Sequence, residues 1–219
     1  MTDVSLLAAV ELFAQLNEAE LQQLDKVAEQ RVMRRGDTLF AEDDPSNELF
    51  VVVRGRIAIA KKSIDGRESM MALMEQGDLF GEMPLFDNKG RSAEARALEP
   101  SEVIVIPYAA LRQVYEARPE LLWSVTDMLV SRLRGVDDAL ADSVFLDVTG
   151  RTAKRLLELA GDADEFSLPI TQEELAGMVG ASRERVNKAI ASFIRLGWID
   201  QSERRYRITD REQLSRRAI

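Results

Sequence analysis

The chain has 219 residues, enough for one large domain or two ordinary ones, and 46% of them are hydrophobic, as a packed core requires. It contains no cysteine and no histidine. This excludes disulfides, thiolate metal sites, histidine-ligated haem and the Ser–His–Asp and Cys–His groups of many hydrolases. No apolar run approaches the roughly 18 residues of a membrane helix, and the N-terminus lacks a secretory signal, so we expect a soluble cytoplasmic protein.

The formal net charge of −9 is unevenly distributed along the chain. Residues 1–149 carry 16 basic and 27 acidic side chains, a net charge of −11. Residues 175–219 carry 10 basic and 5 acidic side chains, a net charge of +5. Only the C-terminal segment therefore has the electrostatics for contacts with nucleic-acid phosphates.

The first half of the chain changes from helical to β periodicity near residue 31. Residues 3–30 have apolar side chains at helical spacing, interrupted near Asn17. The following segment consists of short β runs separated by glycine turns, which predicts an antiparallel barrel or sandwich. The four clearest runs are 48–53, 56–61, 69–74 and 103–106.

The segment 77–97, GDLFGEMPLFDNKGRSAEARA, combines a glycine turn, an acid, a short apolar helical turn and an Arg-Ser pair. Backbone N–H groups at the start of the helical turn, with Arg91 nearby, predict a small anion site. The neighbouring carboxylate of Glu82 could accept hydrogen bonds from sugar hydroxyls. The alternative is that Arg91 only pairs with one of the many surface acids.

Residues 119–144 predict a long helix, with Pro119 in its first turn. Its apolar residues recur every three or four positions, a narrow stripe that is typical of a two-stranded coiled coil. The alternative is a single helix packed on its own barrel. The stripe consists of Leu122, Val125, Leu129, Leu133, Val136, Leu140 and Val144. A hinge at 145–151 then precedes a helix at 152–160 that Asp147 or Thr149 caps, and an acidic loop at 161–169.

Residues 171–193 have the pattern of a helix-turn-helix. Thr171 and Glu174 form a capping box, Gly180 suits a tight turn, and Ser182 caps a second helix. The second helix has apolar residues on one face and charged ones on the other, so an ordinary helical hairpin with a solvated face is the alternative. Two short strands at 198–200 and 206–209 complete a winged helix-turn-helix.

These motifs together resemble the cyclic-AMP receptor protein family of bacterial transcription regulators, over essentially the whole chain. The matching segments are FGE (80–82), RSA (91–93), FLDVTGR (145–151) and GASRERVNKA (180–189), and the pattern is closer to actinobacterial receptors than to the enterobacterial one. The resemblance implies an α+β fold with a jelly-roll-like β-roll that binds a cyclic nucleotide, a dimerisation helix and a winged helix-turn-helix. These parts correspond to residues 1–118, 119–145 and 146–219.

The resemblance also assigns the ligand site. Glu82 would accept the ribose 2′-hydroxyl, with backbone contacts from Gly81 and Met83, while Arg91 and Ser92 would hold the cyclic phosphate. Members that bind cyclic AMP place a Thr, followed by Ser or Asn, against the adenine amino group. Here Val136 and Asp137 occupy those positions, and only Asp137 could accept a hydrogen bond. Cyclic AMP is the expected effector, and no metal is expected.

On the DNA side, the family reads a TGTGA half-site. Arg183 would contact guanine, Glu184 would accept from a cytosine amino group, and Lys188 would occupy a second basic position. The residues expected to hold phosphates are Ser182, Arg185, Arg204 and Arg205.

The sequence thus predicts a homodimeric, ligand-gated transcription regulator that is not an enzyme and binds palindromic double-stranded DNA. Dimerisation through 119–145 and an interaction with RNA polymerase are expected, and no membrane association. One alternative is a regulator of the same fold that is effector-independent or responds to another ligand, such as a cyclic dinucleotide. A second alternative is a regulatory subunit or enzyme module that uses the β-roll alone. The presence of a helix-turn-helix argues against it.

Overall fold

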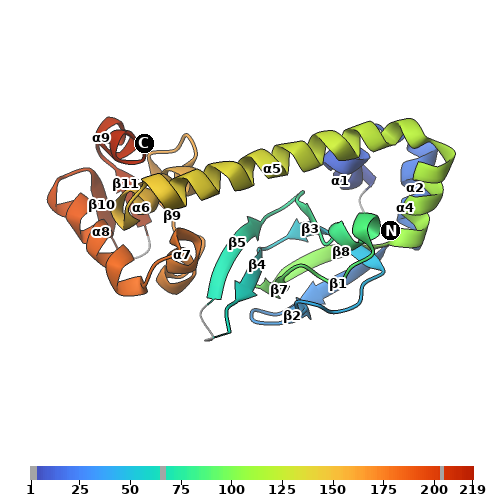
Figure 1. Ribbon diagram of the computed structural model, residues 1–219, viewed down its shortest axis with the longest axis horizontal. Coiled ribbons are helices and arrows are strands. Elements are labelled where there is room, and N and C mark those ends of the chain that lie inside the picture. The colour runs from blue at the N-terminus through green and yellow to red at the C-terminus, as the bar shows by residue number, and fades with distance from the viewer. Residues whose placement is uncertain (1–3, 65–67, 203–204) are drawn as a thin grey trace. The chain divides into compact units, whose positions relative to one another are not determined.

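The computed structural model describes residues 4–64, 68–202 and 205–219, and its chain divides into two compact units, residues 1–133 and 134–219 (Figure 1). Among these residues, no helix is long and apolar enough to cross a bilayer. The long helix α5 (Leu122–Phe145) contributes to both units.

The first unit begins with a helical segment that packs against one side of a β-structure. Asn17 interrupts the helical pattern as predicted, because it is the N-cap of the second helix. The Asn17 side chain accepts from the Glu20 N–H, and the Glu20 carboxylate accepts from the Asn17 N–H. The helical elements of this unit before α5 are α1 (Val4–Ala9), η1 (Glu11–Phe13), α2 (Glu18–Val27), α3 (Met83–Asp87), α4 (Tyr108–Ala117) and η2 (Pro119–Leu121).

The β-structure of the first unit comprises two four-stranded antiparallel sheets, ordered β1-β8-β3-β6 and β2-β7-β4-β5. This confirms the predicted antiparallel barrel or sandwich. The strands are β1 (Glu29–Met33), β2 (Thr38–Phe40), β3 (Glu48–Arg54), β4 (Ile57–Lys62), β5 (Glu68–Met74), β6 (Leu79–Phe80), β7 (Glu94–Ala97) and β8 (Ser101–Pro107).

Strand β3 is buried on both faces because it separates two hydrophobic clusters. Leu49 and Val51 belong to the cluster shared with the helices, whereas Phe50 and Val52 belong to the cluster inside the β-roll. Successive side chains of a strand point to opposite faces, so a continuous apolar run is what a doubly covered strand requires. Phe50 of the inner cluster lies next to Gly81 and to the guanidinium of Arg91.

Helix α5 follows a 3-10 turn that begins at Pro119, so this proline lies just before the α-helix rather than in its first turn. Val125 and Met128 are buried in the first unit. The other predicted stripe residues are 40–67% exposed, so packing of the helix on its own β-roll accounts for only a short part of the stripe. These exposed residues are Leu122, Leu129, Leu133, Val136, Leu140 and Val144.

The second unit has the predicted helix-turn-helix and a small antiparallel sheet of order β10-β11-β9. The capping box of Thr171 and Glu174 is present, Gly180 has a φ of +67° at the turn, and Ser182 caps the second helix. The elements are α6 (Val148–Ala160), β9 (Glu165–Ser167), α7 (Gln172–Val179), α8 (Arg183–Arg195), β10 (Ile199–Ser202), β11 (Arg205–Ile208) and α9 (Arg211–Arg217).

Two local predictions for this unit were wrong. The acidic segment 161–169 is not entirely a loop, because it contains β9, which pairs with β11. This pairing stacks the ring of Phe166 on that of Tyr206, with 5.6 Å between the ring centres. Helix α6 starts at Val148 rather than Thr152. Asp147 is its cap and accepts from the Gly150 N–H at 2.8 Å, so the hydrogen bonding of α6 begins inside the predicted hinge.

The capping box gives a stability prediction for the second unit. Thr171→Ala removes the acceptor of the Glu174 N–H and should lower the free energy of unfolding by about 1 kcal/mol. Urea unfolding followed by Trp198 fluorescence, in a Trp123→Phe background, measures this unit separately. Thr126→Ala is the control, since Thr126 only donates to the Leu122 carbonyl within its own helix. An unchanged midpoint for Thr171→Ala would contradict the capping role.

Candidate functional site

The Arg91 side chain is only 4% exposed and lies at the centre of the first unit's candidate site. Its Nη1 donates to the Gly81 carbonyl at 2.8 Å and to the Tyr108 hydroxyl at 3.1 Å, and its Nη2 donates to the Glu48 carbonyl at 2.8 Å. Within the described parts of the chain, no carboxylate lies within ion-pair distance, so the alternative of a surface ion pair is wrong. The Nε–H group is buried and has no hydrogen-bond partner.

Aromatic rings and backbone contacts hold Arg91 in place. Its guanidinium carbon lies 4.2 Å from the ring centre of Phe40 and 5.2 Å from that of Phe50, an arrangement that stabilises a cation. Its backbone N–H donates to the Asp44 carbonyl at 3.0 Å, and its carbonyl accepts from the Asp43 N–H at 2.9 Å. Burial lowers the pKa of Arg91, and the nearby Tyr108 and Glu48 oppose this effect. A buried cation with an unused donor favours an anionic ligand.

Tyr108 is a buried member of the site that the sequence analysis missed. Its hydroxyl donates to the Gly81 carbonyl and accepts from Arg91 Nη1, so it connects the two segments that carry the FGE and RSA motifs. Burial raises the pKa of Tyr108, which keeps the hydroxyl protonated as a donor. No sequence pattern links Tyr108 to these motifs, because the contact depends on where β8 ends against β3.

The Glu82 carboxylate is 2% exposed and forms an ion pair with Arg132 of α5. Arg132 Nη1 donates to Glu82 Oε1 at 2.5 Å, and Nη2 donates to the Leu79 carbonyl at 2.8 Å. Sequence analysis missed Arg132 because 29 basic residues offer no sign of which one pairs with a given acid. The structure therefore adds α5 to the site at the residue directly before Leu133.

The remaining predicted ligand residues of the first unit lie next to these groups. Gly81 has a φ of +77°, and a side chain there would begin 2.7 Å from Arg91 Nη1. Met83 and Ser92 are exposed, and the Ser92 hydroxyl donates to the Met83 sulfur at 3.4 Å. The structure thus brings together all five predicted residues at 81–83 and 91–92.

Val136 and Asp137 lie on exposed turns of α5 in the second unit, and Val136 is 61% exposed. Neither residue has a hydrogen bond from its side chain to another group in the described parts of the chain. These two positions remain available to a ligand or another chain.

The predicted DNA-contacting residues lie mainly on one exposed face of α8. Its opposite face is buried through Val186, Ala189, Ile190 and Phe193. Ser182 acts as a helix cap, accepting from the Arg185 N–H at 3.4 Å. The exposed residues are Arg183, Glu184, Arg185 and Lys188 on α8 and Arg205 on β11, whereas Arg204 lies outside the described residues.

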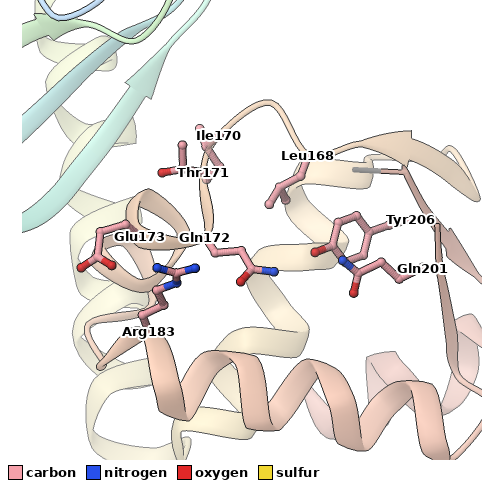
Figure 2. Close-up of a pocket in the computed structure, with 8 residues that line it drawn as sticks. All are labelled: Leu168, Ile170, Thr171, Gln172, Glu173, Arg183, Gln201 and Tyr206. Carbon is pink, nitrogen blue, oxygen red and sulfur yellow. The ribbon is translucent and has the colours of Figure 1, made fainter. Parts of the chain in front are cut away.

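A pocket of about 320 Å³ opens between the starts of α7 and α8 and strands β10 and β11 (Figure 2). Its apolar floor includes Leu168 and Ile170, and its polar rim includes Glu173 and Arg183. No group of three side chains suited to a metal ion occurs in the described segments.

Comparisons with known proteins match both parts of the chain. The family model of the cyclic nucleotide-binding domain matches residues 30–118, and that of the Crp-like helix-turn-helix domain matches residues 150–217. The CRP-like cAMP-activated global transcriptional regulator of Mycobacterium tuberculosis is 37% identical over 97% of this chain and 98% of its own length.

Solved structures show the same fold. FixK2 from Bradyrhizobium japonicum has a TM-score of 0.80 at 22% identity, covering 88% of this chain and 98% of that one. The c-di-GMP responsive global regulator CLP from Xanthomonas campestris has a TM-score of 0.75 at 23% identity, covering 88% and 99%.

The close approach of Gly81 to Arg91 gives a second prediction. Gly81→Ala places an alanine in a backbone conformation with positive φ, which lowers the free energy of unfolding by about 1–2 kcal/mol. It also places the new Cβ against Arg91 Nη1. Gly77→Ala is a matched control, because Gly77 has a φ of +91° but nothing within 4 Å of its Cβ position. Urea unfolding should show a larger loss of stability for Gly81→Ala. Equal losses would mean that the contact with Arg91 has no energetic consequence.

Proposed function

Because the chain belongs to the cyclic-AMP receptor protein family of transcription regulators, we propose that it is a homodimer that binds palindromic DNA under the control of cyclic AMP. Its Crp-like helix-turn-helix implies DNA binding, and the similar curated proteins are named as transcription regulators rather than enzymes. We assign the cytoplasm as its location, where it has access to DNA, and RNA polymerase as its partner in transcription.

The buried guanidinium of Arg91 is the observation that carries the nucleotide assignment. It has no carboxylate partner in the described residues, and its Nε–H group has no acceptor. A cyclic phosphate would supply a negative charge and acceptor oxygens to this group, with Ser92 as a further donor. This fit supports a phosphate-bearing ligand at the RSA motif.

The neighbouring Glu82 carboxylate supports a ribose. Arg132 bonds to Oε1 of Glu82, so Oε2 is the proposed acceptor for the ribose 2′-hydroxyl. A ligand hydroxyl at Glu82 changes the surroundings of Arg132, which lies on α5 beside Leu133 of the exposed stripe. Nucleotide binding is thereby coupled to α5, the proposed dimerisation helix.

The exposed stripe of α5 supports a parallel coiled coil between two copies through residues 119–145. Leu133, Val136, Leu140 and Val144 are 60–67% exposed and recur every three or four residues, which is the spacing of a two-stranded seam. A two-fold dimer places two recognition helices on half-sites about one helical turn apart.

The exposed face of α8 supports recognition of TGTGA-like half-sites. Arg183 is the proposed contact to guanine O6 and N7, and Glu184 is the proposed acceptor for a cytosine amino group. Lys188 provides a second basic contact. Phosphate contacts are assigned to Ser182, Arg185, Arg204 and Arg205.

The alternative is a regulator of this fold that is effector-independent or responds to another ligand, such as a cyclic dinucleotide. The observation in its favour is Val136, which presents a methyl-bearing side chain without hydrogen-bonding groups where the family places a Thr. CLP, which has the same fold, is described as c-di-GMP responsive.

The phosphate assignment is tested with Arg91→Leu. Loss of a buried charge that pairs with the ligand should weaken cyclic AMP binding by about 2–4 kcal/mol in calorimetric titration. The variant should also lose cyclic AMP-dependent binding to a duplex with two TGTGA half-sites. Arg112→Leu is the control, since Arg112 is exposed and bonds to Leu85 and Asn88 on α3 and just after it.

Arg91 also satisfies three acceptors in the free protein, so Arg91→Leu is expected to lower the free energy of unfolding. The titration is therefore made at a temperature where circular dichroism shows the variant folded. Wild-type affinity in the folded variant would overturn the phosphate assignment. Cyclic AMP binding without any effect on DNA affinity would favour effector-independent regulation.

The base assignment is tested with Val136→Thr. An added hydroxyl facing the adenine amino group should tighten cyclic AMP binding by about 0.5–1.5 kcal/mol, the net value of one hydrogen bond. Asp137 accepts from that amino group, whereas the cyclic GMP carbonyl would face it with lone pairs, so cyclic AMP should bind more tightly than cyclic GMP. Titrations of both nucleotides, with Val144→Thr as the control, measure this. Preference for cyclic GMP, or no binding of either, would contradict the assignment.

A further inference from the structure

Glu173 lines the same pocket of the DNA-binding unit as Arg183. In Figure 2, the Arg183 guanidinium lies between the Glu173 carboxylate and the Gln172 amide, with all three side chains at the pocket. Glu173 is the second residue of α7, and Arg183 is the first residue of α8. An acid therefore lines the same pocket as the first residue of the recognition helix.

Several other acids of this unit have a structural role. Glu174 accepts from the Thr171 N–H, Asp210 caps α9, and Glu212 pairs with Arg216. Glu173 and Arg183 differ, because each is exposed and neither side chain has a hydrogen bond or ion pair in the described parts of the chain. Both side chains line the pocket and are open to solvent.

We infer that Glu173 is a specificity-determining residue that acts through Arg183 and disfavours the binding of non-target DNA. The inference rests on the proposed function, in which Arg183 reads a guanine. The residue does not contact a base itself. It keeps phosphates out of the pocket that Arg183 also lines, which leaves the Arg183 guanidinium free to bind guanine.

The physical basis is the competition between two kinds of acceptor for one flexible arginine. On non-target DNA, binding is almost entirely electrostatic, so an unrestrained Arg183 adds a phosphate contact. On target DNA, the same guanidinium makes two hydrogen bonds to guanine O6 and N7. A carboxylate beside the pocket repels a phosphate there but leaves the bidentate guanine contact in the groove available. It therefore weakens non-target binding more than target binding.

The test compares Glu173→Gln with the wild type on two duplexes, one with two TGTGA half-sites and one of the same length and composition with scrambled half-sites. For Glu173→Gln, affinity for the scrambled duplex should rise about 3–10-fold, while affinity for the matched duplex changes by less than about twofold. The salt dependence of scrambled-duplex binding should become steeper by about one unit, since one more phosphate is contacted.

Two further variants separate this role from a general change in charge. Glu173→Asp retains the carboxylate and should retain the wild-type ratio of the two affinities. Glu158→Gln removes an acid from α6, where Glu158 pairs with Arg155, and should leave that ratio unchanged. Thermal unfolding confirms that each variant is folded.

An equal gain on both duplexes for Glu173→Gln, or no gain on either, would overturn the inference. Failure of Glu173→Asp to retain the ratio would overturn it as well. Arg183→Ala distinguishes this result from failure of the proposed function. If Arg183→Ala weakens binding to both duplexes equally, Arg183 does not read a base, and the proposed role of Arg183 in DNA recognition is wrong. If Arg183→Ala selectively weakens binding to the matched duplex while Glu173→Gln leaves the ratio of the two affinities unchanged, only the inference about Glu173 fails.

Discussion

The first unit is organised around a guanidinium that is buried without a carboxylate. Arg91 is held by two carbonyl groups, one hydroxyl and the faces of two phenylalanine rings. Removing a cation from water is unfavourable unless its donors are satisfied, and one donor of Arg91 is not. The surrounding strands therefore hold a positive charge ready for an anion, and the absence of a side chain at Gly81 is what allows the guanidinium to lie there.

A second buried charge links this site to the long helix. Glu82 directly follows Gly81 in the chain, and its ion-pair partner Arg132 lies on α5. The Glu82 side chain is 2% exposed and that of Arg132 is 41% exposed, so only the carboxylate is buried, and removing Arg132 would leave that carboxylate without a charged partner. Any ligand that engages Glu82 must therefore do so while Arg132 remains nearby or finds another acceptor. This constraint gives the helix a direct electrostatic connection to the occupancy of the site.

The DNA-binding unit depends on local interactions to a greater degree. The Thr171–Glu174 box, the glycine turn and the Ser182 cap each involve residues only a few positions apart. They fix the ends of α7 and α8, and burial of one face of α8 leaves its charged face exposed. Contacts from more distant segments then close the unit, such as Arg151, which donates to the carbonyls of Leu146 and Val179.

The sequence by itself determined strands β3, β4, β5 and β8 and the two wing strands, the capped helices, the helix-turn-helix and the residues of the FGE and RSA motifs, because these features depend on neighbours in the chain or on residue periodicity. Only the tertiary structure decided that Tyr108 and Arg132 belong to the ligand site, that Glu173 shares a pocket with Arg183, and that the segment at Phe166 is a strand. Arg132 and Glu82 are 50 residues apart, and Arg91 and Glu48 are 43 apart. Glu82 pairs through its carboxylate and Glu48 accepts through its backbone carbonyl, and in each case many other groups could form the contact, so packing of the folded strands and helices selects among them.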